Sequence, residues 1–167
     1  MRKEIDYQLS KHFSLYEIME GSELPKEAIE MNWKHFDEFN KQKFIELCAF
    51  MDDVREIIDI EFKSDTSKAE IGFEVTAGFR CKEWELHQGR SGNSQHIIAA
   101  VDVQAFNCSN IMSAQILGWL YRKYNDRTTG HKGGFAIKRP KFDGKGNAVL
   151  VGFIHFDLRK EIARWEY

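Results

Sequence analysis

The sequence has few of the residues that stabilise small domains by special means. Its 167 residues include only three cysteines and two prolines. Cys48, Cys81 and Cys108 are odd in number, widely spaced and form no Cys-x-x-Cys pair. This argues against both a disulfide framework and a cysteine zinc site. We therefore expect a protein made for a reducing compartment.

Long hydrophobic runs and an excess of one charge are also missing. No apolar run approaches the roughly 20 residues that span a bilayer, and the N-terminus is too polar for a secretory signal. Lys and Arg number 24 against 26 for Asp and Glu, which gives a net charge of -2. This balance excludes the global positive field of non-specific nucleic-acid binders. We expect synthesis in the cytoplasm without a signal peptide, no membrane partner and no nucleic-acid partner.

The sequence has ample material for a hydrophobic core. Hydrophobic residues make up 43% of it, and the aromatic residues are 13 Phe, 5 Tyr and 4 Trp. Together with 30% charged residues, these are the proportions of a globular domain. Because the chain has no linker-like stretch and no internal repeat, residues 1–167 are predicted to form a single domain.

Helical periodicity is clearest from Lys41 to Ile58, where apolar residues recur every three or four positions. A further helix is predicted from Ser113 to Tyr124. Residues 10–20 predict a short helix entered from a loop, with Ser14 as its N-cap. The buried stripe of the 113–124 helix is expected to consist of Ile116, Leu117, Leu120 and Tyr121.

Strands are predicted where hydrophobic and polar residues alternate. The pattern around residues 71–75 is typical of a half-buried strand, and residues 99–106 form a second extended segment with Asp102 near its start. The C-terminal part predicts a hairpin of residues 134–142 and 148–158. The expected fold class is α+β, a small antiparallel sheet with helices packed on one side.

Two histidines are placed to form a metal site with nearby carboxylates. His96 ends a loop containing glycine and serine, and Asp102 follows six positions later. His155 and Asp157 lie two positions apart, so both point to one face of a strand. Two imidazoles and one carboxylate are a ligand set used by catalytic zinc sites. From spacing alone, the alternative remains that His96 is a surface residue and that Asp157 merely satisfies His155.

The chain resembles the zinc D-alanyl-D-alanine carboxypeptidase family. That family includes phage endolysins that cut L-alanyl-D-glutamate bonds, and it shares its fold with the hedgehog signalling domain. The start of the chain, Ser10-Lys11-His12-Phe13-Ser14-Leu15 with Glu17, is similar to one branch of the family, so the resemblance covers nearly the whole chain. The segments that carry it are, in order, Ala77-Gly78-Phe79-Arg80-Cys81, Gly92-Asn93-Ser94-Gln95-His96, Ala100-Val101-Asp102-Val103, and Phe153-Ile154-His155-Phe156-Asp157 with Ala163-Arg164-Trp165.

The resemblance implies a metal and a substrate site. It implies Zn²⁺ ligands at His96, Asp102 and His155, and it implies that Arg80 and Ser94 bind a carboxylate of the substrate. The planar guanidinium of Arg80 can donate two parallel hydrogen bonds to such a group. The alternatives are a surface salt bridge for Arg80 and a turn hydrogen bond for Ser94.

Two positions depart from the family's pattern. Relatives place the aspartate seven positions after the first histidine, and here Asp102 follows His96 by six. Asp102 can then be a ligand if the chain after His96 forms a tighter turn. Relatives also carry a base where this chain has Gly152 and Phe153. Asp157 is therefore the candidate for the catalytic base or for the residue that orients His155, and we expect the orienting role.

Other side chains are weaker candidates. His131 is expected to be a solvated loop residue, and the four tryptophans are expected in the core or in the wall of a cleft. The basic run of residues 138–141 is expected to be a solvated hairpin face, with contact to an anionic wall polymer as the alternative.

The sequence thus predicts a zinc-dependent peptidase that hydrolyses peptide bonds of peptidoglycan stem peptides or cross-links. Without a signal peptide, a phage lysis enzyme or virion component is favoured, acting at the cell wall after phage-mediated release. Virion assembly partners are then also expected. Both carboxypeptidase and endopeptidase action remain open. The alternative is a non-catalytic structural or wall-binding protein that keeps the peptidase fold.

Overall fold

The structure is a computed structural model that describes residues 7–22, 24–62 and 70–167. Its contacts divide the chain into two compact units. Unit 1 consists of residues 1–53 and 75–101, and unit 2 consists of residues 54–74 and 102–167. This division does not test whether the units fold independently, so the single domain stays a prediction.

Helix α1 (Leu15–Met19) in unit 1 begins where the sequence predicts it. The Ser14 side chain accepts a hydrogen bond from the Glu17 amide at 3.3 Å, and the Glu17 carboxylate accepts one from the Ser14 amide at 2.8 Å. This reciprocal pair satisfies two amides that a helix start leaves without partners. Helix α1 packs against α2 (Lys26–His35), which also contacts α4 (Lys82–His87). The periodicity analysis did not predict α2 or α4.

Helix α3 (Glu38–Phe62) confirms the strongest helical pattern and extends it at both ends. It begins earlier than predicted because the Asp37 carboxylate accepts a hydrogen bond from the Asn40 amide at 2.9 Å. The predicted apolar face is buried along its whole length. That face consists of Phe44, Leu47, Cys48, Met51, Val54 and Ile58.

Two buried asparagines organise the loops of unit 1. The Asn32 amide nitrogen donates to the Phe79 carbonyl at 2.7 Å, and its side-chain oxygen accepts from the Cys81 amide at 2.8 Å. The Asn40 amide nitrogen donates to the Ile97 carbonyl at 2.8 Å. These side chains supply hydrogen bonds that neither a helix nor a strand provides to these buried main-chain groups.

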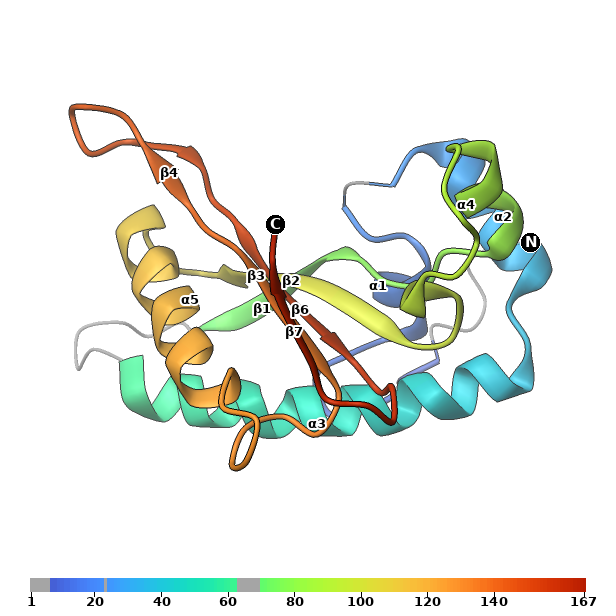
Figure 1. Cartoon of the computed structure of the whole chain (residues 1–167), viewed down its shortest axis with the longest axis horizontal. Helices are drawn as coiled ribbons and strands as arrows, with labels where there is room; N and C mark the ends of the chain where they lie inside the picture. The colour runs from blue at the N-terminus through green and yellow to red at the C-terminus, as the bar shows by residue number, and fades with distance from the viewer. Residues whose placement is uncertain (1–6, 23, 63–69) are drawn as a thin grey trace. The chain divides into compact units, whose positions relative to one another are not determined.

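Five strands form one sheet in the order β1-β2-β6-β3-β7 (Figure 1). β3 pairs antiparallel with β6 and parallel with β7. The sheet is therefore mixed, and the expected wholly antiparallel sheet is wrong. After β6 the chain reverses direction and joins the far edge of β3, which makes β7 parallel to β3. The strands are β1 (Gly72–Ala77), β2 (Ala100–Phe106), β3 (Gly134–Lys138), β6 (Phe153–Asp157) and β7 (Ala163–Glu166).

The positions of β1 and β2 confirm the two extended segments predicted in the middle of the chain. The burial of β1 differs from the prediction, because every residue in it except Glu74 is buried. Thr76, expected on the solvated face, is 2% exposed. β1 is thus covered on both faces, and its alternating sequence did not reveal this.

The predicted C-terminal hairpin of unit 2 is confirmed, but each of its two arms is interrupted once and so consists of two strands. Beyond β3 and β6 it continues as β4 (Lys141–Phe142) and β5 (Ala148–Leu150), which pair antiparallel and project from the sheet in Figure 1. Pro140 lacks the amide that a ladder needs. Gly152 has a φ of +80°, and a Cβ there would lie 2.3 Å from the Lys138 carbonyl oxygen. These two residues explain why the long strands are interrupted.

Helix α5 (Asn110–Tyr124) packs against β3 and β6 in unit 2. It begins before the predicted Ser113 because Ser109 is its N-cap and accepts a hydrogen bond from the Met112 amide at 3.2 Å. Tyr124 is buried and Tyr121 only partly so, which corrects the predicted stripe at one position. The other three predicted residues are fully buried, namely Ile116, Leu117 and Leu120. Among the described residues, no helix is both long and apolar enough to cross a membrane.

Replacing Asn32 by Ala should lower the free energy of unfolding by about 1–3 kcal/mol, because the Phe79 carbonyl and the Cys81 amide would lose their buried partner. Urea denaturation followed by circular dichroism measures this loss. Asn93→Ala is the matched control, since Asn93 is exposed, and it should be close to neutral. Equal stability of the two variants would contradict the role of Asn32.

Candidate metal centre

His96 is a buried residue of unit 1 and not the surface residue that the simpler alternative expected. It lies in a short 3₁₀ turn (Gln95–Ile97) and is 2% exposed. Its Nδ1 atom lies 2.6 Å from the Gly78 carbonyl oxygen. Because a carbonyl only accepts hydrogen bonds, Nδ1 carries the proton and Nε2 is the nitrogen with the lone pair. A neutral His96 thus has the tautomer in which Nε2 can bind a metal.

The 3₁₀ turn also provides the tighter path that the short spacing to Asp102 requires. The Ile97 amide donates to the Ser94 carbonyl at 3.1 Å, and the Ile98 amide donates to the Gln95 carbonyl at 2.9 Å. These bonds span three residues and not four, which shortens the turn. β2 then begins at Ala100.

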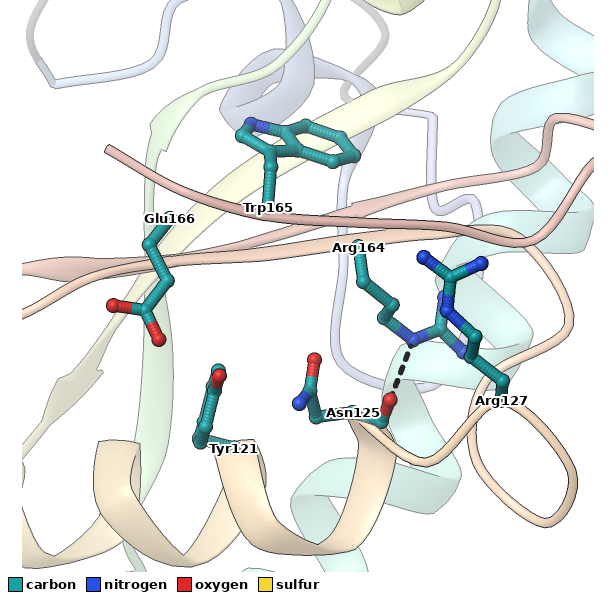
Figure 2. Close-up of a pocket in the computed structure, with 6 residues that line it drawn as sticks. All are labelled: Tyr121, Asn125, Arg127, Arg164, Trp165 and Glu166. Atoms are coloured by element: carbon teal, nitrogen blue, oxygen red, sulfur yellow. Dashed lines mark hydrogen bonds between the residues drawn. The ribbon is translucent and has the colours of Figure 1, made fainter.

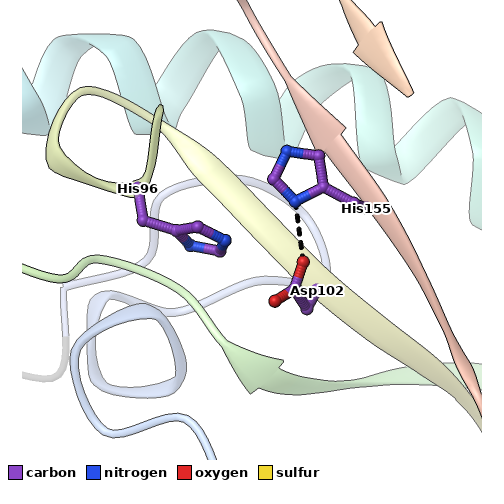
Figure 3. A group of neighbouring side chains, drawn as sticks. All are labelled: His96, Asp102 and His155. Atoms are coloured by element: carbon purple, nitrogen blue, oxygen red, sulfur yellow. Dashed lines mark hydrogen bonds and ion pairs between the residues drawn. The ribbon is translucent and has the colours of Figure 1, made fainter. Parts of the chain in front are cut away.

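Asp102 and His155 meet on neighbouring strands, β2 and β6. The Nδ1 atom of His155 lies 2.7 Å from Oδ1 of Asp102 (Figure 3). His155 is 3% exposed and Asp102 is 8% exposed. The pairing of β2 with β6 brings together two residues that are 53 positions apart in the sequence.

His96, Asp102 and His155 each offer one ligand atom, and these atoms all lie within 4.8 Å of one another (Figure 3). A tetrahedral zinc ion with ligand distances of about 2.0–2.2 Å separates its ligand atoms by roughly 3.4 Å. The Nδ1 atom of His155 and the Oδ1 atom of Asp102, which lie 2.7 Å apart, would have to move apart to surround an ion. The group could hold a metal ion, and its two imidazoles and one carboxylate suit zinc.

Asp157, at the end of β6, is fully buried and holds His155 from the side opposite Asp102. Its Oδ2 atom lies 3.0 Å from Nε2 of His155. The carboxylate also accepts hydrogen bonds from the Gly134 amide at 2.9 Å and from Nη2 of Arg159 at 2.6 Å. Burial raises the pKa of this carboxyl, but the hydrogen bonds from His155 and Arg159 outweigh burial and hold the pKa well below its usual range. Asp157 is therefore ionised.

His155 lies between two carboxylates. Burial lowers the pKa of His155, but the hydrogen bonds to Asp102 and Asp157 outweigh it and raise the pKa above its usual value. A metal ion bound at Nδ1 would replace the proton shared with Asp102. The Nε2 proton would still be donated to Asp157, which is how carboxylates commonly orient the histidines that bind metals.

His131 is buried, so the expectation of a solvated loop histidine is wrong. It is 8% exposed, and its Nε2 atom lies 2.7 Å from the main-chain oxygen of Asp157. Arg164 holds the loop in place by donating to the carbonyls of His131 and Gly133. A Cβ at Gly133 would lie 2.1 Å from the same Asp157 oxygen. The neighbouring glycines were the sequence signal that this loop is closely packed.

Trp165 is partly buried and packs beside His155. In the sheet, Ala136 of β3 is in register with His155 on one side and with Trp165 on the other. Because Ala136 is small, the Trp165 and His155 rings approach to 5.1 Å between centroids. The guanidinium of Arg159 lies 4.8 Å from the centre of the indole ring.

A hollow of about 370 Å³ lies on the other side of β7. Figure 2 shows the Trp165 indole pointing away from the side chains of Arg164 and Glu166. The Nε atom of Arg164 donates to the Asn125 carbonyl at 3.0 Å, so this guanidinium holds the loop and is not free to bind a ligand. The hollow is distinct from the His155 face of the sheet. It is lined by Tyr121, Asn125, Arg127, Arg164, Trp165 and Glu166.

Arg80 and Ser94 lie next to His96 in unit 1. The Arg80 amide donates to the His96 carbonyl at 3.2 Å, and the Ser94 hydroxyl accepts from the His96 amide at 3.3 Å. The Nε atom of Arg80 forms an ion pair with Glu85 at 3.3 Å. Ser94 thus makes the turn hydrogen bond of its simpler interpretation, and Arg80 forms a salt bridge, as its simpler interpretation expected, although with a buried partner.

Comparisons of the chain with models of protein families, with curated proteins and with solved structures found no match. The structure shows a mixed α+β fold and the buried His-Asp-His group. The family resemblance still depends on the ordered sequence segments alone.

Replacing His155 by Ala should abolish stoichiometric zinc binding, because one of three ligands is lost. Elemental analysis after dialysis against zinc measures the occupancy. His87→Ala, at an exposed histidine, is the control and should keep the ion. The zinc-free protein should remain folded by circular dichroism, since its core is large enough without a metal. If the wild-type protein contains no zinc after zinc has been added, the proposed site is contradicted.

Replacing Asp157 by Asn should weaken zinc binding by about 10 to 100-fold, because the amide no longer orients His155 as a charged acceptor. A competition titration with a zinc-sensitive dye measures the affinity. Asp143→Asn is the control, since Asp143 accepts main-chain hydrogen bonds at the exposed hairpin tip. Unchanged zinc affinity combined with lost hydrolytic activity would instead identify Asp157 as the base.

Proposed function

We propose that the chain is a zinc-dependent peptidase of the hedgehog-like fold, which hydrolyses peptide bonds of peptidoglycan stem peptides or cross-links. The observation that carries the proposal is the buried group of His96, Asp102 and His155. These are the three residues at which the family resemblance implies zinc ligands. The similarity to the endolysin branch supports a phage lysis enzyme or virion component that acts at the cell wall.

Each residue of the group has a defined part in this proposal. His96 would bind through Nε2 and His155 through Nδ1, as their hydrogen bonds indicate. Asp102 would add one negative charge to the ligand set. A zinc ion held there would act as a Lewis acid towards a peptide carbonyl and would make water nucleophilic near neutral pH.

The contacts of Asp157 favour an orienting role over proton transfer. Its carboxylate has no exposed surface and accepts hydrogen bonds from His155, Gly134 and Arg159. A general base needs direct or water-mediated access to the proton that it removes. Asp157 therefore suits the positioning of His155 better than the activation of water.

A non-catalytic wall-binding protein is the second candidate. The observation that favours it is the presence of Gly152 and Phe153 where relatives carry a base. Neither residue can accept a proton. Such a protein would keep the peptidase fold and bind the wall without a productive zinc site and without cleaving stem peptides.

Incubation with isolated cell walls distinguishes the two candidates. The zinc-loaded protein is expected to reduce wall turbidity and to release new amino and carboxyl termini, identified by mass spectrometry of the products. His155→Ala protein provides the background. Wall binding without new termini would favour the non-catalytic candidate, and neither binding nor cleavage would overturn both.

Arg80→Lys should lower kcat/KM for stem peptides by at least about tenfold although the positive charge is kept, because an ammonium cannot donate two parallel hydrogen bonds to a carboxylate. Steady-state kinetics with a synthetic stem pentapeptide measures the effect. Lys82→Arg, on the exposed surface of α4, is the control. Equal kcat/KM for wild type and Arg80→Lys would refute the assignment of Arg80.

A further inference from the structure

A buried acid lies beside the arginine assigned to the substrate carboxylate. Glu85, on α4, is 2% exposed. Its Oε1 atom lies 3.3 Å from Nε of Arg80 and accepts a hydrogen bond from Nη1 of Arg90 at 2.8 Å. A carboxylate is rarely buried unless nearby cations compensate its charge. Glu85 thus joins two guanidinium groups in unit 1.

The ion pair with Glu85 holds the Nε side of the Arg80 guanidinium, although Nε makes no hydrogen bond within the described part of the chain. Nε of Arg80 is buried, whereas 17% of the whole side chain is exposed. The atom pair that defines this ion pair is Nε of Arg80 and Oε1 of Glu85. Two guanidinium charges and one carboxylate charge leave the cluster at +1. The cluster therefore still attracts an anion after Glu85 is paired.

The local backbone explains why these three side chains meet. Asn32 holds the main chain on both sides of Arg80, at Phe79 and Cys81. α4 then carries Glu85 back towards Arg80. Gly89, with a φ of +70°, turns the chain, and the Arg90 amide donates to the Glu85 carbonyl at 3.0 Å.

We infer that Glu85 is a positioning residue, which holds Arg80 as the binding group for a free carboxylate and so makes the site select carboxylate ligands over carboxamides. The inference rests on the proposed function, in which Arg80 binds the substrate. A guanidinium that is already fixed loses less conformational freedom when the ligand binds. Its planar end can then form two charge-assisted hydrogen bonds with a carboxylate, which a carboxamide cannot replace.

The test compares two small ligands, N-acetyl-D-alanine and its carboxamide, in titrations of the zinc-loaded protein followed by ¹⁵N NMR of the arginine side chains. Wild type should bind the carboxylate at least about tenfold more tightly than the carboxamide. Glu85→Gln should reduce this ratio to about threefold or less, because loss of the ion pair releases the Arg80 guanidinium, and we expect this release to outweigh the attraction of the cluster's additional positive charge. Glu83→Gln, on the same helix but exposed, should keep the wild-type ratio. A general structural defect would weaken both ligands alike and would not change the ratio.

The inference would be overturned if Glu85→Gln kept the wild-type ratio of affinities. It would also be overturned if the wild type showed no preference for the carboxylate. If circular dichroism shows that Glu85→Gln is unfolded, Glu85→Asp is used in its place. The side chain of Asp is shorter by one methylene, so its carboxylate lies farther from Arg80 and the ratio should also fall. Hydrolysis of stem pentapeptide by the same preparations tests the proposed function separately. Wild type that prefers the carboxylate but hydrolyses no peptide would overturn the peptidase and leave the role of Glu85 standing.

Discussion

The C-terminal half of unit 2 depends on the hydrogen bonds that the ionised, fully buried carboxylate of Asp157 accepts. A buried charge is tolerated only when surrounding groups compensate it. Here the compensation comes from the start of β3 at Gly134, from His155 two residues earlier and from Arg159 two residues later. A Cβ at Gly134 would lie 2.3 Å from Oδ2 of Asp157, so only glycine allows this approach. The Asp157 carboxylate therefore joins the start of β3 to the end of β6.

The same physical device recurs at each candidate functional side chain. His155 is fixed by the Asp157 carboxylate, His96 by the Gly78 carbonyl, and Arg80 by the buried Glu85. In every case one polar end of the side chain is paired with a buried acceptor. In the function that we propose, the opposite end would contact the metal or the substrate. Such fixed side chains lose little freedom on binding, which is how rigid sites gain affinity.

Sequence reasoning succeeded where a local pattern determines the structure and failed where a tertiary contact does. Periodicity predicted α3, because the burial of its apolar face repeats along the chain itself. It missed α4, whose Glu85 is buried only because two arginines meet it. It also misplaced His131, because the packing of that loop depends on Arg164, more than thirty positions away.

The ligand set illustrates the same limit. The spacing of two between His155 and Asp157 correctly predicted a shared strand face, because strands have a period of two. The pairing of His155 with Asp102 could not come from spacing, since it depends on β6 lying between β2 and β3. Because of this order, Asp102 lies on one side of His155 and Ala136 lies on the other. Ala136 is small, so the Trp165 ring can approach the imidazole. A larger side chain at this position would separate the indole from the imidazole.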